Sequence, residues 1–251
     1  MAESKREAED RVEGKNAVME ALKAGRPLDK IYIARGEQDK ALRFIAQKGK
    51  AAGAVISEVD RRKLDAMSVT HAHQGVIAVA AVREYASVSD ILALAREKGE
   101  APLVVVCDEI SDPHNLGAII RTAECAGAHG VIIPKHRSAG VTAVVEKTSA
   151  GAVEHMAVAR VGNLAAALKE LQDAGVWIFG TAADGDRSLW EADLKGPAAL
   201  VIGSEGSGMS RLTRESCDFL LSIPLRGKVS SLNASNAAAI VLYEAVRQRL
   251  G

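Results

Sequence analysis

The second half of the chain alternates between short apolar runs and segments in which apolar positions recur with helical spacing. The runs predict strands at LVVVCDEI (103–110), GVIIP (130–134), MAVARV (156–161), VWIFGTA (176–182), AALVIGSE (198–205) and FLLSIP (219–224). The helical spacing predicts helices at about 115–126, 141–150 and 163–174 and at the C-terminus. Nearly continuous Val/Ile/Leu strands separated by helices are typical of a mostly parallel sheet covered on both faces. Residues 103–251 are therefore predicted to form an α/β domain.

A smaller α/β pattern precedes this domain. Strands are expected at 31–34, 54–59 and 75–81, and helices at about 16–23 and 42–51. Residues 13–82 are thus predicted to form a small domain of about 70 residues.

Residues 83–102 are interpreted as a linker that carries one helix, with Ser89 or Asp90 as its N-cap and Gly99 at its end. Residues 1–12 are expected to be a disordered tail.

Composition adds a charge asymmetry to this picture. The 251 residues are 48% hydrophobic, which is enough for packed cores, and the formal net charge is zero. Residues 11–63, however, hold 13 Lys or Arg against 7 Asp or Glu, whereas residues 101–251 hold 14 against 16. The basic character therefore lies at the N-terminal end.

The cysteines and the absence of long apolar runs bound the protein class. Cys107, Cys125 and Cys217 are widely spaced and form no CxxC pair, which argues against a disulfide framework or a zinc site. No apolar run approaches the roughly 20 residues that cross a membrane, and residues 1–13 are charged rather than signal-like. We expect a cytoplasmic protein with no metal site and no membrane partner.

Three polar segments follow predicted strands, where parallel sheets form their ligand sites. The first is DEISDPHNLGAIIRTAECAGA (108–128), in which Arg121 follows Asn115 by six residues and lies some 120° away around a helix. Taken alone, this segment is explained by Asn115 as a helix cap and Arg121 as an exposed cation. A site above the strand end is the alternative.

The second segment, VIGSEGSGMS (201–210), is rich in glycine, which allows a close backbone approach to a ligand. It matches neither GxGxxG nor a Walker loop. Glu205 in its middle disfavours phosphate and suits a ligand with a cation or hydroxyl groups. An ordinary glycine-rich turn is the alternative.

The third segment is VSSLNASNAAAIVLYEAV (229–246). Asn233 or Ser235 would be enough to cap the last helix. The segment nevertheless contains five small polar residues, namely Ser230, Ser231, Asn233, Ser235 and Asn236. The surplus suggests ligand contacts.

Together, in this order and at these distances, the three segments resemble the motifs of the SpoU (TrmH) family of RNA ribose 2′-O-methyltransferases in the SPOUT superfamily. NLGAIIRTAECAGA resembles the first motif, VIGSEGSGMS the second and IPLRGKVSSLNASNAAAI the third. EGKNAVMEAL (13–22) and HQGVIA (73–78) also resemble the family's small L30e-like substrate-binding domain. This layout is closest to bacterial enzymes that methylate a guanosine of 23S ribosomal RNA. Ala234 and Asn236 depart from the family pattern, which leaves the substrate subgroup open.

The resemblance implies a SPOUT-type C-terminal domain with a deep trefoil knot, S-adenosylmethionine as the cofactor, an RNA substrate and a homodimer formed through the C-terminal domain. The residues it implies for cofactor binding are Thr181, Ala182, Ala183, Gly203, Ile223 and Leu232. The residues it implies for catalysis are Arg121, Asn115, Glu205, Ser231 and Asn233.

Each catalytic candidate has an expected role. A guanidinium is almost always protonated and is therefore a poor base, so we expect Arg121 to bind the adjacent phosphate and stabilise the developing alkoxide. Asn115 and Asn233 would orient Arg121 or the ribose. Ser231 would hydrogen-bond the target nucleotide, and Glu205 would fix the motif loops or an arginine. His114 is a weaker candidate for a general base.

Other functions stay open at this point. The basic N-terminal region is expected to contact RNA phosphates, and the RNA could be tRNA instead of 23S ribosomal RNA. A non-catalytic RNA-binding or ribosome-assembly protein could use the same scaffold. A nucleotide-dependent oxidoreductase would need GxGxxG after the first strand of the larger domain, where DEISDPHNLG stands instead.

Overall fold

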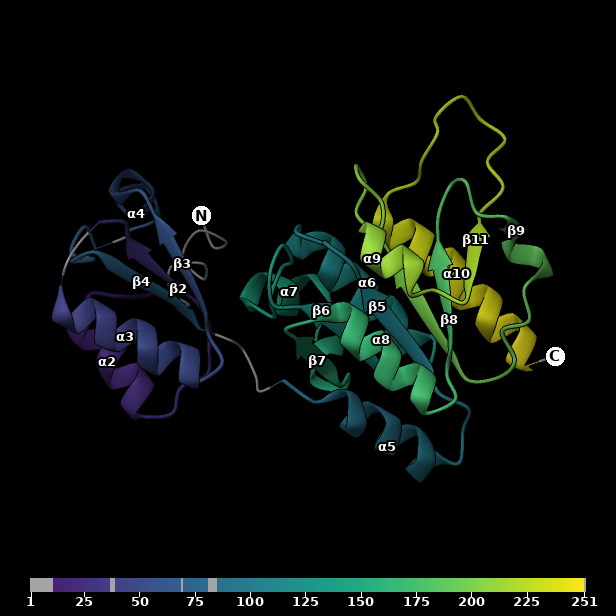
Figure 1. The fold of residues 1–251 in the computed structure, drawn as a ribbon, viewed down its shortest axis with the longest axis horizontal. Coiled ribbons are helices and arrows are strands. Elements are labelled where there is room, and N and C mark those ends of the chain that lie inside the picture. Colours follow the sequence, from purple (N-terminus) through teal and green to yellow (C-terminus); the bar gives the residue numbers. More distant parts are fainter. Residues whose placement is uncertain (1–10, 37–38, 69, 81–84, 251) are drawn as a thin grey trace. The chain divides into compact units, whose positions relative to one another are not determined.

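The structure is a computed structural model that describes residues 11–36, 39–68, 70–80 and 85–250. These residues belong to two compact units, one made mostly of residues before 85 and the other mostly of residues from 85 onward. Figure 1 labels the helices and strands of both units.

The first unit contains a four-stranded sheet with the order β1-β4-β2-β3. Its elements are β1 (Arg11–Glu13), α2 (Lys15–Lys23), β2 (Leu28–Ala34), α3 (Lys40–Ala51), β3 (Val55–Val59), α4 (Arg61–Met67) and β4 (Val76–Ala80). β1 and β2 pair antiparallel with β4, and β3 pairs parallel with β2. The three predicted strands and two predicted helices are confirmed, except that residue 81 of the third predicted strand lies outside the described residues. β1 and α4 were not predicted.

β1 corrects part of the expected disordered tail. Residues 1–10 lie outside the described residues, but Arg11 and Val12 pair with Val79 and Ala78 on β4. Val12 also packs against the hydrophobic core of the unit. Strand pairing and the partial burial of this apolar side chain therefore order the segment, which its charged composition alone did not indicate.

The second unit is built on a seven-stranded sheet in which every strand pairing is parallel. In spatial order its strands are β7 (Val158–Val161), β6 (Gly130–Pro134), β5 (Leu103–Cys107), β10 (Ala198–Ile202), β8 (Trp177–Thr181), β11 (Phe219–Ser222) and β9 (Arg187–Ser188). Every residue of β5 and β10 is buried, because both faces of the sheet are covered. The predicted parallel α/β architecture is confirmed.

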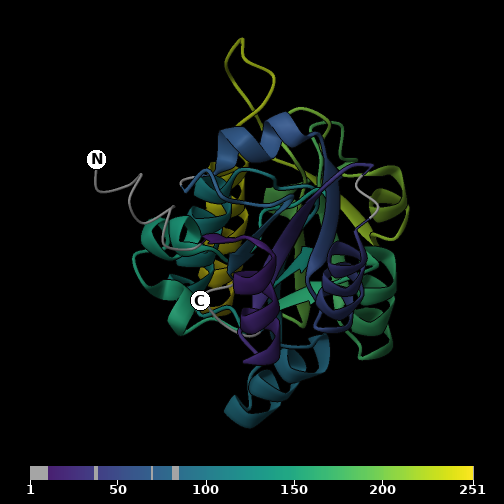
Figure 2. The same ribbon diagram turned by 90° about the vertical axis from the view of Figure 1, so that its left-hand side faces the viewer.

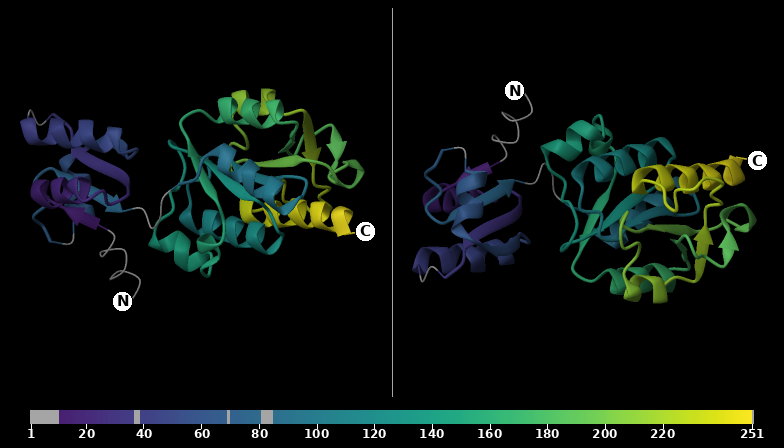
Figure 3. Two further views of the ribbon diagram at one scale, coloured as in Figure 1. Left: turned by 90° about the horizontal axis from the view of Figure 1, so that it is seen from below. Right: turned by 90° about the horizontal axis from the view of Figure 1, so that it is seen from above.

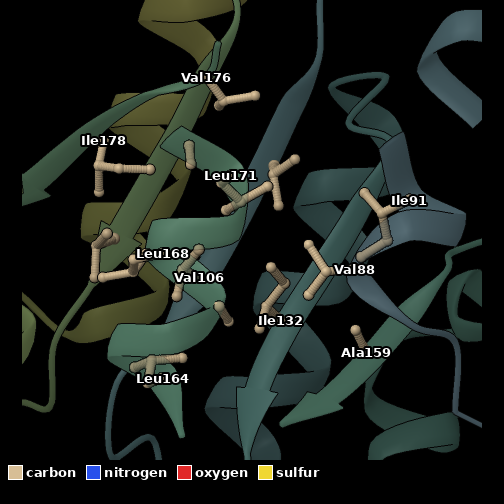
Figure 4. Packing of buried hydrophobic residues seen from close by; sticks show 14 of the residues in the cluster. Val88, Ile91, Val106, Ile132, Ala159, Leu164, Leu168, Leu171, Val176 and Ile178 are labelled. Atoms are coloured by element: carbon tan, nitrogen blue, oxygen red, sulfur yellow. The ribbon is translucent and has the colours of Figure 1, made fainter. Parts of the chain in front are cut away.

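Helices cover both faces of this sheet. The helices after residue 85 are α5 (Val88–Lys98), α6 (Pro113–Cys125), α7 (Ala143–Thr148), α8 (Leu164–Asp173), α9 (Arg211–Glu215) and α10 (Ala234–Leu250), with the short 3-10 helices η1 (Ala152–Glu154) and η2 (Leu189–Glu191). The first two residues of α7 group with the first unit. α8 and α9 lie on one face, and α6 and α10 pack together on the other (Figure 3). Ile91 of α5 and Leu168 of α8 belong to one buried cluster with Val106 of the sheet (Figure 4). In the described part of the chain, no helix is both long and apolar enough to cross a membrane.

The helix expected within residues 83–102 is α5, but its cap differs from the prediction. Ser87 is the N-cap: its hydroxyl accepts a hydrogen bond from the Asp90 backbone N–H at 3.1 Å, and Asp90 Oδ2 accepts one from the Ser87 N–H at 2.8 Å. This reciprocal capping box starts the helix earlier than a cap at Ser89 or Asp90 would. Gly99 ends the helix with φ 68°, as expected. Residues 83 and 84 lie outside the described residues.

Candidate active site

The strand order places the ends of four strands side by side. β10 lies between β5 and β8, and β8 lies between β10 and β11. Because these strands are parallel, the loops that follow them emerge at the same edge of the sheet. The loop of residues 223–233, after β11, extends away from this edge (Figures 1 and 2). All three polar segments therefore converge on one edge of the second unit.

The loop after β10 folds back tightly on itself. Ser204 and Gly208 exchange two backbone hydrogen bonds of 3.0 Å, and Gly208 has φ 68°. A Cβ atom at Gly203 would lie only 2.4 Å from the backbone of Gly208 and Met209, so no side chain fits there. The glycines thus permit the turn that holds Glu205.

Glu205 is the centre of a polar network that joins the three segments. Its Oε1 accepts hydrogen bonds from Asn115 Nδ2 at 3.0 Å, from Asn233 Nδ2, and from the Ala234 backbone N–H at 3.4 Å. Asn233 Nδ2 also donates to Asn115 Oδ1 at 2.9 Å. Two amides that are 118 residues apart and one carboxylate therefore fix one another's orientation. We call these three residues, Asn115, Glu205 and Asn233, the amide–carboxylate network.

Asn233 also caps α10. Its Oδ1 accepts hydrogen bonds from the backbone N–H groups of Ser235 at 3.0 Å and Asn236 at 3.3 Å. The cap uses the oxygen of the side-chain amide, and the network uses its nitrogen. The capping interpretation of the third segment is thus correct, and a polar network exists beside it.

For Asn115 the capping interpretation is wrong. α6 begins at Pro113, and Asp112 is its N-cap, accepting a hydrogen bond from the His114 backbone N–H at 2.9 Å. Proline at the first helical position favours this earlier start, because its missing N–H needs no partner there. Asn115 lies inside the first turn of α6, and its side chain is free to bind Glu205.

A cavity of about 470 Å³ lies beside the network, and we call it the first cavity. Its lining includes all six residues that the family resemblance implies for cofactor binding: Thr181, Ala182, Ala183, Gly203, Ile223 and Leu232. Glu205 and Ser231 line it as well. Its volume lies in the range of about 300–1,000 Å³ that is typical of small-molecule sites.

The first cavity also has a charged wall that the sequence analysis missed. Arg214 of α9 donates two hydrogen bonds, of 2.8 and 3.0 Å, to the carboxylate of Asp184. The hydrogen bonds from Arg214 lower the pKa of Asp184, so both groups are charged at neutral pH. Thirty residues separate them in the sequence, and no local pattern marks such a pair.

Asp108, at the end of β5, is a second missed residue. It is buried, and its Oδ2 accepts a hydrogen bond of 2.6 Å from the Ser210 backbone N–H. This bond ties the loop after β5 to the end of the glycine-rich loop. The sequence did contain a signal for Asp108, because a carboxylate directly after a predicted buried strand is unusual enough to mark a candidate site residue.

A second cavity of about 500 Å³ adjoins the first. The two share Ser204, Glu205, Gly206, Ser207 and Ala234 in their linings. The rest of the second cavity is lined by residues that follow β5 and β6, including Asn115. The amide–carboxylate network therefore stands at the border between the two cavities.

Arg121 is not part of this arrangement within one chain. It is exposed on α6 and lines neither cavity. Its side chain has no hydrogen bond or ion pair to any residue that the structure describes. His114 is also separate from the network. Its Nδ1 lies 3.5 Å from Thr148 Oγ1.

Comparisons with known proteins agree with this arrangement. The family model described as the SpoU rRNA Methylase family matches residues 102–243, and a model described as RNA 2′-O ribose methyltransferase substrate binding matches residues 11–86.

Individual relatives resemble nearly the whole chain. The "Putative TrmH family tRNA/rRNA methyltransferase YacO" of Bacillus subtilis is 49% identical, with 96% of both chains covered. The 23S rRNA (guanosine-2′-O-)-methyltransferase RlmB of Ralstonia nicotianae is 46% identical, with 89% of both chains covered. The crystal structure of the SpoU methyltransferase AviRb from Streptomyces viridochromogenes, in complex with the cofactor AdoMet, is 29% identical. It has a TM-score of 0.59 and covers 96% of this chain and 90% of its own.

The trefoil knot that the resemblance implies stays a prediction, whereas the fold and the family are established. The parallel sheet, the loops at its edge and the matches over both units agree with one another, and the chain belongs to the SpoU rRNA methylase family of RNA 2′-O-methyltransferases.

Proposed function

We propose that this chain transfers a methyl group from S-adenosylmethionine to the ribose 2′-hydroxyl of a guanosine in 23S ribosomal RNA. The observation that carries the proposal is the amide–carboxylate network at the border of two cavities, in a chain of this family. The name of the Ralstonia nicotianae relative supports the substrate, and the AdoMet complex of AviRb supports the cofactor.

The residues of the first cavity fit S-adenosylmethionine. Ile223, Leu225 and Leu232 offer apolar walls for a flat base, and the absence of a side chain at Gly203 brings the backbone close. The carboxylate of Glu205 suits a ligand that carries positive charge. When bound there, the cofactor would supply an electrophilic methyl group on a cationic sulfur.

The chain's own contribution would be to align the acceptor. Because the cofactor supplies the electrophile, orientation of the ribose oxygen is the main requirement for the protein. A ribose in the second cavity would meet Asn115 and Glu205, which are already held by Asn233. Ser231 is exposed on the lining of the first cavity, where its hydroxyl is available to the target nucleotide.

We place Arg121 at this site through a homodimer of the second units. The side chain lines neither cavity of its own chain and is exposed, so it is available to another subunit. The partner subunit's Arg121 would bind a phosphate and stabilise the developing alkoxide. A guanidinium is almost always protonated, so the hydroxyl proton would pass to a phosphate oxygen or to water.

We place RNA recognition in the first unit and the reaction in the cytoplasm. The substrate-binding model matches residues 11–86, where the excess of positive charge also lies. Positive side chains bind RNA phosphates by displacing counterions. A tRNA substrate is the second candidate, because the Bacillus subtilis relative's name includes both tRNA and ribosomal RNA.

Transfer of labelled methyl groups tests the proposal. The purified protein is incubated with methyl-labelled S-adenosylmethionine and, in separate reactions, with unmodified 23S ribosomal RNA and unmodified tRNA. We expect label in the 23S RNA. Label in tRNA alone would replace the first candidate by the second. A protein that binds RNA but not the cofactor would be a non-catalytic RNA-binding protein, contrary to the proposal.

A further inference from the structure

The second cavity has a single cationic side chain among its lining residues, all of which the structure describes: Arg137, in the loop after β6. The other charged groups in this lining are Glu109, Asp112 and Glu205. Asp112 caps α6, and Glu205 is bound by two asparagine side chains. Glu109 is the carboxylate that holds Arg137.

The pair between Arg137 and Glu109 can open easily. Arg137 Nη1 donates to Glu109 Oε1 at 3.0 Å, while the Arg137 side chain remains 81% exposed. An ion pair with so exposed a guanidinium contributes little to stability, although the Glu109 side chain is only 26% exposed. A guanidinium also binds phosphate as well as it binds carboxylate, through the same fork of N–H groups. A phosphate can therefore replace Glu109 as the partner of the guanidinium.

The backbone holds both residues of the pair in a fixed place. Glu109 has φ 58° and Arg137 has φ 56°, which is the left-handed region that residues other than glycine rarely adopt. Their loops are joined next to these positions: Ile110 O accepts hydrogen bonds from the Ala139 N–H at 2.8 Å and from Ser138 Oγ at 3.2 Å. Such conformations persist only where the surroundings enforce them, and they cluster at functional sites.

We infer that Arg137 binds an RNA phosphate next to the target ribose, and that Glu109 holds the guanidinium in place until RNA displaces it. The inference rests on the proposed function. A ribose in RNA is flanked by phosphates on both sides. If its 2′-hydroxyl lies at the network, one of these phosphates falls in or beside the second cavity, whose lining includes both Asn115 and Arg137.

The variant Arg137→Gln tests this contact, with Arg211→Gln as a matched control. Arg211 is 82% exposed and pairs with Glu215 at 3.2 Å, but it lines neither cavity. We expect Arg137→Gln to raise KM for unmodified 23S ribosomal RNA about tenfold, because a hydrogen bond to a charged group is lost. Its affinity for S-adenosylmethionine and its melting temperature should stay unchanged. The control variant should resemble the wild type in all four measurements, including the salt dependence that follows.

The salt dependence of RNA binding separates a phosphate contact from an indirect effect. The plot of log affinity against log salt concentration has a negative slope, and loss of one phosphate contact should make this slope less steep by about 0.7 to 0.9. A variant that merely distorts the loop would weaken binding with the slope unchanged, and this result would overturn the inference.

Glu109→Gln gives the opposite expectation. Without the competing carboxylate, Arg137 is free for RNA, so KM for the RNA should equal or fall below the wild-type value. If Glu109→Gln and Arg137→Gln raised KM equally, the pair would be a structural tie and the inference would be wrong. If the wild-type protein methylated neither 23S RNA nor tRNA, the proposed function would fail and take this inference with it. An active wild type with an unaffected Arg137→Gln variant would overturn the inference alone.

Discussion

The side chain of Asn233 is bonded at both ends of its amide. Its oxygen caps α10, and its nitrogen donates to Asn115 and Glu205. A local role in the helix and a long-range role in the site therefore coincide in one residue. The two roles can be separated by substitution, because serine also caps helices well but has no amide nitrogen.

Asn233→Ser should keep the fold and lose the reaction. We expect its free energy of unfolding to stay within about 0.5 kcal/mol of the wild type, because the cap is preserved. Its kcat should fall about 100-fold, the usual effect of removing one positioned donor from an active site. Chemical denaturation and steady-state methyl transfer measure the two quantities.

Asn233→Ala is the matched control for this prediction. It removes the cap as well, so its free energy of unfolding should fall by about a further 1 kcal/mol while its kcat resembles that of Asn233→Ser. Near-normal kcat in the serine variant would show that the amide–carboxylate network is not needed for the reaction.

Local patterns located some site residues and missed others for a physical reason. Glu205 and Asn233 stand in unusual surroundings, a glycine-rich loop and a surplus of small polar residues, so the sequence marks them. In the sequence, Asp184 and Arg137 are indistinguishable from ordinary surface charges. Their partners, Arg214 for Asp184 and Glu109 for Arg137, lie about 30 residues away and contact them only in the folded chain. The roles implied by family resemblance for the lining of the first cavity came from motif similarity and not from periodicity.

Among the secondary-structure elements, α10 contributes to the candidate site at its N-terminal end and to the stability of the fold near its C-terminal end. Glu244 is buried there and accepts hydrogen bonds from Arg247 at 2.8 and 2.9 Å and from Gln248 at 2.7 Å. Gln248 continues the connection, because its side chain also bonds the backbone of Ala192 and Leu194. Hydrogen bonds from Arg247, and then from Gln248, outweigh the effect of burial and lower the pKa of Glu244 to about 2.

Glu244→Gln should therefore destabilise the protein in a pH-dependent way. The pKa is lowered from its ordinary value of 4.5, so the stabilisation is complete above about pH 5 and is lost as the pH falls towards 2. We expect the variant to lose about 1–2 kcal/mol at pH 7, since hydrogen bonds to a charged group are weakened but not abolished.

Urea denaturation at pH 7 and at pH 3.5 measures this effect. The difference between Glu244→Gln and the wild type should shrink at the lower pH. Glu215→Gln is the control, because Glu215 pairs with Arg211 on the surface of α9. Its free energy of unfolding at pH 7 should be almost the same as that of the wild type. A destabilisation that did not change between the two pH values would contradict the lowered pKa.

Secondary structure was predictable where burial dictates the pattern. β5 reads LVVVC because every one of its positions is buried, and its neighbours in the sheet are similarly apolar. β9, with two residues, and α9, with five, are too short for a periodic pattern, so tertiary pairing decides them. The position of β10 between β5 and β8 could not be predicted from the sequence either, because strand order depends on long-range pairing.

At the scale of the whole molecule, the proposed homodimer predicts an active site that is shared between two subunits. The chain's own Arg121 lines neither cavity, so an active site would need the network of one subunit and the partner subunit's Arg121. Homodimers of Arg121→Ala and homodimers of Glu205→Ala should both be inactive. A mixed dimer of the two variants would contain one complete site.

Co-expression of the two variants with different affinity tags allows the mixed dimer to be purified and tested. We expect about half of the wild-type methyl transfer, because one of the two sites of a symmetric dimer is restored. A mixed dimer as inactive as its parents would place Arg121 and Glu205 in the same subunit's site. A monomeric protein with full activity would remove the need for a partner.

Mass spectrometry of nucleosides then tests the reaction itself. Unmodified 23S ribosomal RNA is incubated with the wild-type protein and methyl-deuterated S-adenosylmethionine, digested to nucleosides and separated. We predict that deuterium appears in 2′-O-methylguanosine and that the Glu205→Ala variant yields none. Deuterium on a base, or no deuterium in RNA despite a bound cofactor, would contradict the assignment of this chain as a ribose 2′-O-methyltransferase of 23S RNA.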